Sequence, residues 1–160
     1  MKFYLNQYLS LLSFLIIPFV MFWNPSWLSL MGSQAYWPIF WLLPWSIING
    51  SFKSMLVGFL LGLILDTIYA DLYTQIPGLM ICGIWFGRVG NLIKLEKNSL
   101  HFGLTAAIGT LICSVIYFCQ IVIHLLLDNS PLWFFYYGVQ NIFAQVLLTG
   151  LFAPVFCKWL

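Results

Sequence analysis

Apolar stretches separated by short polar breaks run through nearly the whole chain. A helix needs ~20 apolar residues to cross a bilayer, and most of these stretches approach that length. The pattern therefore predicts a compact bundle of six transmembrane helices. Six crossings and their short loops use up nearly all of the sequence. The expected helices cover residues 8–23, 35–48, 54–70, 76–93, 102–127 and 132–157.

The breaks contain residues that stop or start helices. Pro25 follows the first apolar stretch, and Gly50 lies in the polar turn that closes the second. The second stretch is short and carries Pro38 and Pro44, which favour a kinked or tilted helix. Pro77 falls in the first turn of the fourth helix, where a missing N–H costs little. These positions support the predicted boundaries.

The amino-acid composition indicates that lipid, not water, surrounds most of the bundle. Hydrophobic residues make up 62% of the chain and charged residues 6%, and the mean hydropathy is +0.98. A typical soluble domain carries about 25% charged residues. So few charges cannot cover a surface that faces water. We therefore expect one polytopic domain, residues 1–160, in a bacterial inner (plasma) membrane, with no soluble domain and no role in binding nucleic acid.

The positive charges predict an orientation. With six crossings, every lysine and arginine lies on or near the side of the two termini, and this side is expected to be cytoplasmic. The loops on the other side carry two acids, Asp71 and Asp128. Near the N-terminus no cleavage site follows the single charge, which favours a retained first helix. The six cations are Lys2, Lys53, Arg88, Lys94, Lys97 and Lys158.

Small residues recur every four positions in the third predicted helix. Gly58 and Gly62 form a Gly-x-x-x-Gly motif, and Asp66 continues the stripe one turn further on. Gly83 and Gly87 repeat the motif in the fourth helix. Such spacing lets two helices approach closely. These faces could therefore pack inside the bundle or form a groove for the helix of a partner protein.

Asp66 is a carboxylic acid within an apolar helix, so it is expected to face protein or water and to have a partner. Three roles remain open: a structural acid bound to backbone or hydroxyl groups, a ligand for a substrate or ion, and a proton relay. His124 lies near the outer end of its own predicted helix and is one candidate partner.

Signatures of catalysis are missing from the sequence. It contains no HExxH, GxSxG or P-loop motif, and two distant histidines do not make a metal site. The four cysteines lie in apolar segments without a CxxC pair, so they are read as small hydrophobes. We expect neither an enzyme nor a cofactor.

The stripe of the third helix resembles the signature of the rod shape-determining protein MreD family. In that family a helix with spaced glycines ends in Gly-Leu-x-x-Asp, as residues 62–66 do here, and a later glycine, here Gly78, opens the next helix. The interval from Asp66 to Gly78 is longer than in many members. The segments 41–46 and 152–155 are similar to the second and last helices of the short, cyanobacterial-type members.

This resemblance implies a non-enzymatic membrane scaffold of the cell-wall elongation (rod) complex, which helps maintain cell shape. The expected partners are an MreC-type membrane protein and, indirectly, the actin-like MreB and the peptidoglycan synthase formed by RodA and a class B penicillin-binding protein. The resemblance also implies partner or helix-packing roles for Gly58, Gly62, Asp66 and Gly78, and the spacing of Gly83 and Gly87 predicts the same role for them.

An alternative is the substrate-binding membrane component of an energy-coupling vitamin transporter, which is also a small six-helix bundle. Such a protein needs a polar pocket near the outer surface. Tyr69, Asp71, His124 and Asp128 could cluster there. An ordered polar cavity on the outer side would favour this alternative, whereas a lipid-exposed glycine groove would favour partner docking.

Overall fold

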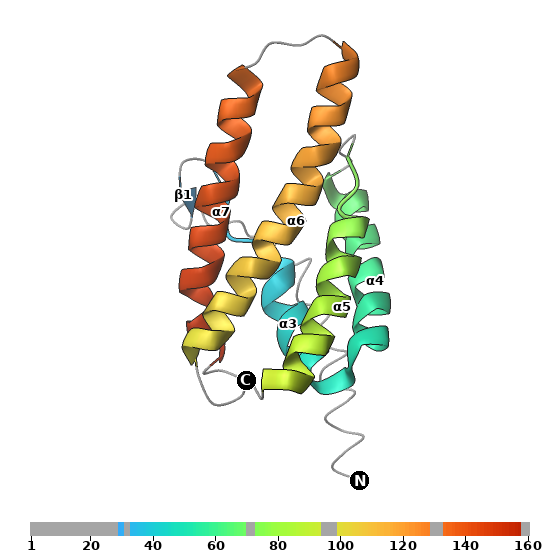
Figure 1. Cartoon of the computed structure of the whole chain (residues 1–160), viewed down its shortest axis with the longest axis vertical. Helices are drawn as coiled ribbons and strands as arrows, with labels where there is room; N and C mark the ends of the chain where they lie inside the picture. Colours follow the sequence, from blue (N-terminus) through green and yellow to red (C-terminus); the bar gives the residue numbers. More distant parts are fainter. Residues whose placement is uncertain (1–28, 31–32, 70–72, 94–98, 129–132, 158–160) are drawn as a thin grey trace.

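The computed structural model describes residues 29–30, 33–69, 73–93, 99–128 and 133–157 (Figure 1). The first predicted helix, residues 8–23, lies outside this part of the chain. So do Asp71 and four of the six cations used to predict the orientation, namely Lys2, Lys94, Lys97 and Lys158.

The described part is mainly helical. Two short antiparallel strands, β1 (Ser29–Leu30) and β2 (Ser33–Gln34), precede five helices. In chain order the helices are α3 (Trp37–Asn49), α4 (Ser51–Tyr69), α5 (Ile76–Ile93), α6 (Ser99–Asp128) and α7 (Trp133–Cys157). Each begins and ends within three residues of its predicted position.

Glycine and proline set the helix ends, as their chemistry requires. Gly50 adopts φ +80° between α3 and α4, a backbone conformation that side-chain-bearing residues rarely adopt. Its N–H donates to the carbonyl of Ser46, and its own carbonyl accepts the hydroxyl of Ser54 at 2.7 Å. Pro38 and Pro77 occupy the first turns of α3 and α5. The joint between α3 and α4 is therefore tight.

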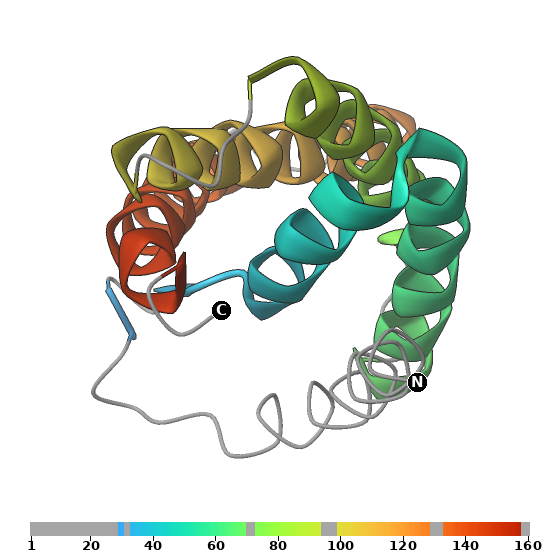
Figure 2. The same cartoon turned by 90° about the horizontal axis from the view of Figure 1, so that it is seen from below.

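The helices form two antiparallel pairs with α3 between them. The α4–α5 pair has the most extensive contact in the structure, and α6–α7 comes next. Figure 1 shows α6 and α7 extending beyond the upper ends of α4 and α5. The view from below shows α3 inside the arrangement, between α4 and α7 (Figure 2). Its buried side chains Ile39, Leu42 and Leu43 contribute to the common core.

The core also contains small polar residues, and three of their hydroxyls donate within their own helices. Thr105, Thr110 and Thr149 are buried, and each donates to the carbonyl four residues earlier at 2.7–2.8 Å. This arrangement satisfies the hydroxyl without a partner from another helix. Small side chains of this kind allow helices to pack closely.

Large apolar side chains lie on the outside. They recur at steps of three or four along three helices, so each helix presents a continuous apolar stripe to its surroundings. Contiguous apolar surface of this kind marks contact with a membrane or with another protein. The exposed residues include Phe52, Leu56, Leu60 and Leu63 of α4, Leu100, Leu104, Leu111 and Val115 of α6, and Val139, Phe143, Leu147 and Leu151 of α7.

Two of the described helices contain stretches long and apolar enough to cross a bilayer, Ser51–Ile68 and Leu100–Leu125. The apolar part of α5, Ile76–Gly90, is shorter. At 1.5 Å per residue the 13 residues of α3 span about 20 Å, less than the ~30 Å hydrocarbon core. The prediction of six crossings is thus matched only in part: the fold is helical, with two candidate spans among the described residues.

Candidate functional site

The glycine stripe of α4 lies directly against α5. A methyl group at Gly62 would come within 2.7 Å of the Cα of Ile76, and one at Gly58 would overlap the backbone carbonyl of Leu79. Carbon atoms in contact normally lie about 3.5–4.0 Å apart, so neither position has room for a side chain. Of the two roles left open for these glycines, the structure supports packing inside the bundle. The groove hypothesis is not supported, because α5 already covers them.

The second glycine motif makes the reciprocal contact. Gly83 lies against the backbone carbonyl of Ser54, and Gly87 lies against the backbone of Ser51. The four glycines therefore hold the backbones of α4 and α5 together along most of the hairpin. Gly78 faces the other way: a methyl group there would lie 3.2 Å from the Cα of Cys113 in α6.

Asp66 completes the hairpin at its far end. Its Oδ1 accepts the backbone N–H of Gln75 at 2.9 Å, immediately before α5 begins. The first N–H groups of a helix have no partner within the helix, and the positive end of the helix dipole favours a carboxylate there. Among the three roles proposed for Asp66, this geometry matches the structural acid bound to backbone.

The outer cluster predicted from Tyr69, Asp71, His124 and Asp128 is described only in part. Asp71 lies outside the described residues, and of Tyr69 and Asp128 the structure gives only their places at the ends of α4 and α6. His124 is exposed, and its ring packs edge-on against Tyr73, with ring centres 5.9 Å apart. Asp66 Oδ1 accepts the N–H of Gln75, and the pairing of Asp66 with His124 stays a prediction.

Tyr73 links the turn before α5 to α6. Its ring packs edge-on against Tyr117 at 5.9 Å as well as against His124. Next to it, Thr74 and the side chain of Gln120 exchange two hydrogen bonds of 3.0 and 3.1 Å. The α4–α5 hairpin is thus attached to the second half of α6 by aromatic and polar contacts.

A cavity of about 330 Å³, lined by polar and apolar side chains and called the polar cavity below, lies beside this junction, and its lining differs from the outer polar cluster predicted from the sequence. It is bounded by α5, α6 and α7 and by the segment that joins β2 to α3. Three hydrogen-bonded pairs of side chains in its lining join separate segments: Ser33 to Asn141, Tyr36 to Gln75, and Ser114 to Gln145.

These pairs have good hydrogen-bond geometry. Ser33 Oγ donates to Asn141 Oδ1 at 2.9 Å, and Ser114 Oγ donates to Gln145 Oε1 at 3.0 Å. The Tyr36 hydroxyl donates to Gln75 Oε1 at 2.8 Å. All lining residues in the described part of the chain are uncharged. A signal existed in the sequence: Ser114, Asn141 and Gln145 are polar residues within otherwise apolar helices.

The cysteines do not form a metal site in the described residues. Cys82 and Cys113 are buried with their sulfur atoms 3.3 Å apart, and Cys82 Sγ also contacts the carbonyl of Gly109. In the part of the chain that the structure describes, no group of three or more metal-binding side chains comes together. The thiols here pack α5 against α6.

Comparison of the chain with models of known protein families, with curated proteins and with solved structures finds no match.

Proposed function

We propose that this chain is a non-enzymatic membrane scaffold of the bacterial cell-wall elongation complex. One observation carries the proposal. The residues that resemble the MreD signature, Gly58, Gly62 and Asp66, act as one structural unit: the glycines seat α5 and the carboxylate binds its N-terminus. The resemblance therefore rests on residues with a joint physical task, not on scattered small residues of the kind common in membrane helices.

The outer surface of the bundle supports the proposal that the chain lies in a membrane. The apolar stripes of α4, α6 and α7 suit hydrocarbon, and the small and hydroxyl-bearing residues lie inside. We propose six crossings, with residues 8–23 as the first. The short α3 would cross together with residues 33–36, a non-helical segment of which Ser33 and Tyr36 line the polar cavity. Such a backbone is tolerated at membrane depth only when it lines a cavity or is buried in protein.

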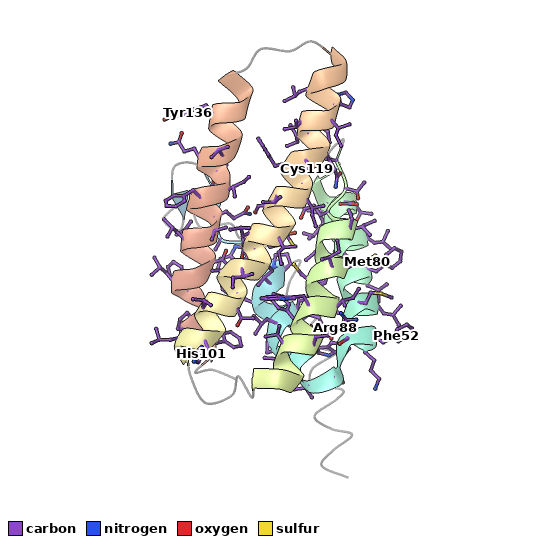
Figure 3. The ribbon with its side chains drawn as sticks, in the orientation of Figure 1. Phe52, Met80, Arg88, His101, Cys119 and Tyr136 are labelled. Carbon is purple, nitrogen blue, oxygen red and sulfur yellow. The ribbon has the colours of Figure 1, made fainter. Side chains whose placement is uncertain are left out.

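The described cations lie at one end of the bundle. Figure 3 shows Arg88 and His101 at the lower end and Tyr136 toward the upper end. Lys53 lies in the first turn of α4, also at the lower end. Under the positive-inside rule the lower end would be cytoplasmic. The polar cavity lies in the opposite half, because its α6 residues run from Cys113 toward the end of that helix and Gly78 lies in the first turn of α5.

A scaffold of this kind acts through surfaces that its own helices leave open. The glycine faces of α4 and α5 are occupied, so a partner would contact the apolar stripes or the helix ends. The partners we propose are an MreC-type membrane protein and, through it, MreB and the RodA synthase with its class B penicillin-binding protein.

Purification of the tagged chain from its native membrane in mild detergent tests the proposal. Proteins recovered with it are identified by mass spectrometry and compared with those recovered with an unrelated tagged membrane protein at equal expression. Specific enrichment of an MreC-type protein and of wall-synthesis enzymes is expected. Enrichment of ATPases with a transport subunit, without those proteins, would contradict the scaffold.

A second function is favoured by one observation. The ordered polar cavity in the outer half is the feature expected of the substrate-binding component of an energy-coupling vitamin transporter. It is built from residues other than the acids and the histidine first considered for such a pocket. The same purification separates the two functions, because the recovered partners differ.

A further inference from the structure

We propose that the polar cavity is a binding site for a small, uncharged molecule that combines a flat ring with hydrogen-bonding groups. The site would exist whether or not the chain belongs to the elongation complex, so this inference goes beyond the scaffold function.

Size limits the ligand. The cavity of about 330 Å³ falls at the lower end of the ~300–1,000 Å³ typical of ligand pockets. It has the volume of about 11 water molecules at the ~30 Å³ that each takes up in the liquid. A single-ring molecule with one or two substituents fits, whereas a whole phospholipid does not.

The lining determines polarity. Asn141 and Gln145 accept serine protons through their amide oxygens, which fixes the orientation of both carboxamides. Each carboxamide also carries an NH₂ group with two donors. The serine oxygens keep lone pairs that can accept. The lining thus holds hydrogen-bonding side chains that are fixed by their mutual bonds before a ligand arrives, which lowers the entropic cost of binding.

The absence of charge among the described lining residues selects against ions. A charged group that enters such a site loses its hydration and finds no opposite charge in the described lining. This transfer costs much free energy. Asp66 is not part of the lining, and its Oδ1 accepts the N–H of Gln75 at the start of α5. A neutral molecule avoids this cost.

The shape of the walls favours a flat ring. Tyr36, Tyr117 and Phe118 contribute aromatic rings to the lining. The Phe118 ring packs against Gly138, which has no side chain. A methyl group at position 138 would overlap this ring. Offset or edge-on packing against such rings stabilises an aromatic ligand by about 0.5–1.5 kcal/mol beyond the area it buries.

Matched neutral and charged probes test the site. Full-length protein in nanodiscs is mixed with nicotinamide or nicotinate, benzamide or benzoate, and uracil or orotate, and binding is followed by saturation-transfer NMR. At least one neutral probe is expected to bind at millimolar concentration, with its charged counterpart about tenfold weaker or more. No binding by any neutral probe, or equal binding by the anions, overturns the proposal and leaves a cavity filled by water.

Two variants locate the binding. Gln145→Met keeps the length of the side chain and removes the carboxamide, so it should weaken the neutral probe at least about fivefold. Phe143→Leu, on the exposed face of the same helix, is the matched control and should leave binding unchanged. Equal binding to both variants would mean that the probe partitions into lipid, which also contradicts the proposal.

A measurement on the unmodified protein applies even if Gln145→Met fails to fold. Cys113 lines the cavity, whereas Cys119 is exposed and is not part of the lining. We expect the neutral reagent N-ethylmaleimide to label the buried Cys113 slowly and the exposed Cys119 faster, and peptide mass spectrometry follows each rate. A bound probe should slow labelling of Cys113 and leave Cys119 unaffected. Identical rates with and without the probe would contradict the assigned site.

Discussion

In the α4–α5 hairpin, glycines hold two backbones together along most of the contact, whereas in the α6–α7 pair they do so at one end only. Near the lower end a methyl group at Gly103 would lie 2.9 Å from the carbonyl oxygen of Gly150. Toward the upper end Gly138 faces the ring of Phe118 instead, and the polar cavity opens beside it. Glycine thus allows backbone contact in the α4–α5 pair, whereas at Gly138 it accommodates an aromatic ring beside the cavity.

This difference separates a rigid part of the molecule from an adaptable one. Backbone atoms in contact cannot move apart without breaking the whole hairpin. Around the cavity, side chains such as Phe118 and Gln145 fill the space between α6 and α7 and can change rotamer. Figure 1 shows the two pairs side by side, so one can support the other.

The largest effect is expected when a large side chain enters the hairpin. Gly58→Leu would push against the backbone carbonyl of Leu79, which cannot rotate away. We expect the free energy of unfolding to fall by about 3 kcal/mol or more, which is the upper end of the range for overpacked cores. Unfolding by SDS titration in mixed micelles measures it. Leu60→Val, on the exposed face of the same helix, should change stability by less than about 0.5 kcal/mol.

Alanine at one glycine of each pair compares the two regions directly. Gly83→Ala would place a methyl group on the carbonyl of Ser54 and should cost about 2 kcal/mol. Gly150→Ala would place one 3.1 Å from the Cβ of Ala107, and the better helix propensity of alanine offsets this crowding. We expect it to stay within about 0.5 kcal/mol of wild type in the same titration. Equal losses at both sites would remove the contrast.

Two substitutions at Asp66 distinguish a structural role from a role in proton transfer. Asp66→Ala removes the acceptor for the Gln75 N–H and should cost about 1.5 kcal/mol, as expected for a hydrogen bond to a charged group. Asp66→Asn keeps an oxygen at that place and should recover most of this stability. Complementation of cell shape, measured by microscopy, should follow stability. A stable Asp66→Asn protein without function would favour a relay or ligand role.

The smallest effect is expected in the lining of the cavity. Ser114→Ala removes one hydrogen bond to Gln145, and the freed amide can bind water in the cavity. Stability should fall by about 0.5 kcal/mol, less than the ~1 kcal/mol typical of a buried hydrogen bond. A loss above about 2 kcal/mol would mean that the cavity is dry and its polar pairs hold α6 and α7 together.

The sequence predicted local features well, because they depend on neighbouring residues. Apolar runs, Gly50 and Pro77 locate five helices within three residues of their observed ends. The spacing of Gly58 and Gly62 indicates that a backbone contacts them, but nothing in one sequence states whose backbone it is. That depends on the way α5 folds back, which brings Gly83 onto Ser54.

The candidate site was harder to predict, because its residues are far apart in the chain. Ser33 and Asn141 are separated by 108 positions, and Tyr36 and Gln75 by 39. Each is a single polar residue among apolar ones, with no motif around it. A single uncharged polar residue of this kind is also compatible with a bond to its own helix, so its type alone does not predict a cavity.

Hydrogen–deuterium exchange of the full-length protein in nanodiscs tests the contrast between the two helix pairs most directly. The account predicts strong protection of amides in 55–66 and 78–88, where two backbones meet, and faster exchange in 117–121 and 138–142, which border the cavity. Equal protection of the four segments, or faster exchange in the hairpin, would contradict a rigid α4–α5 unit beside an accessible polar cavity.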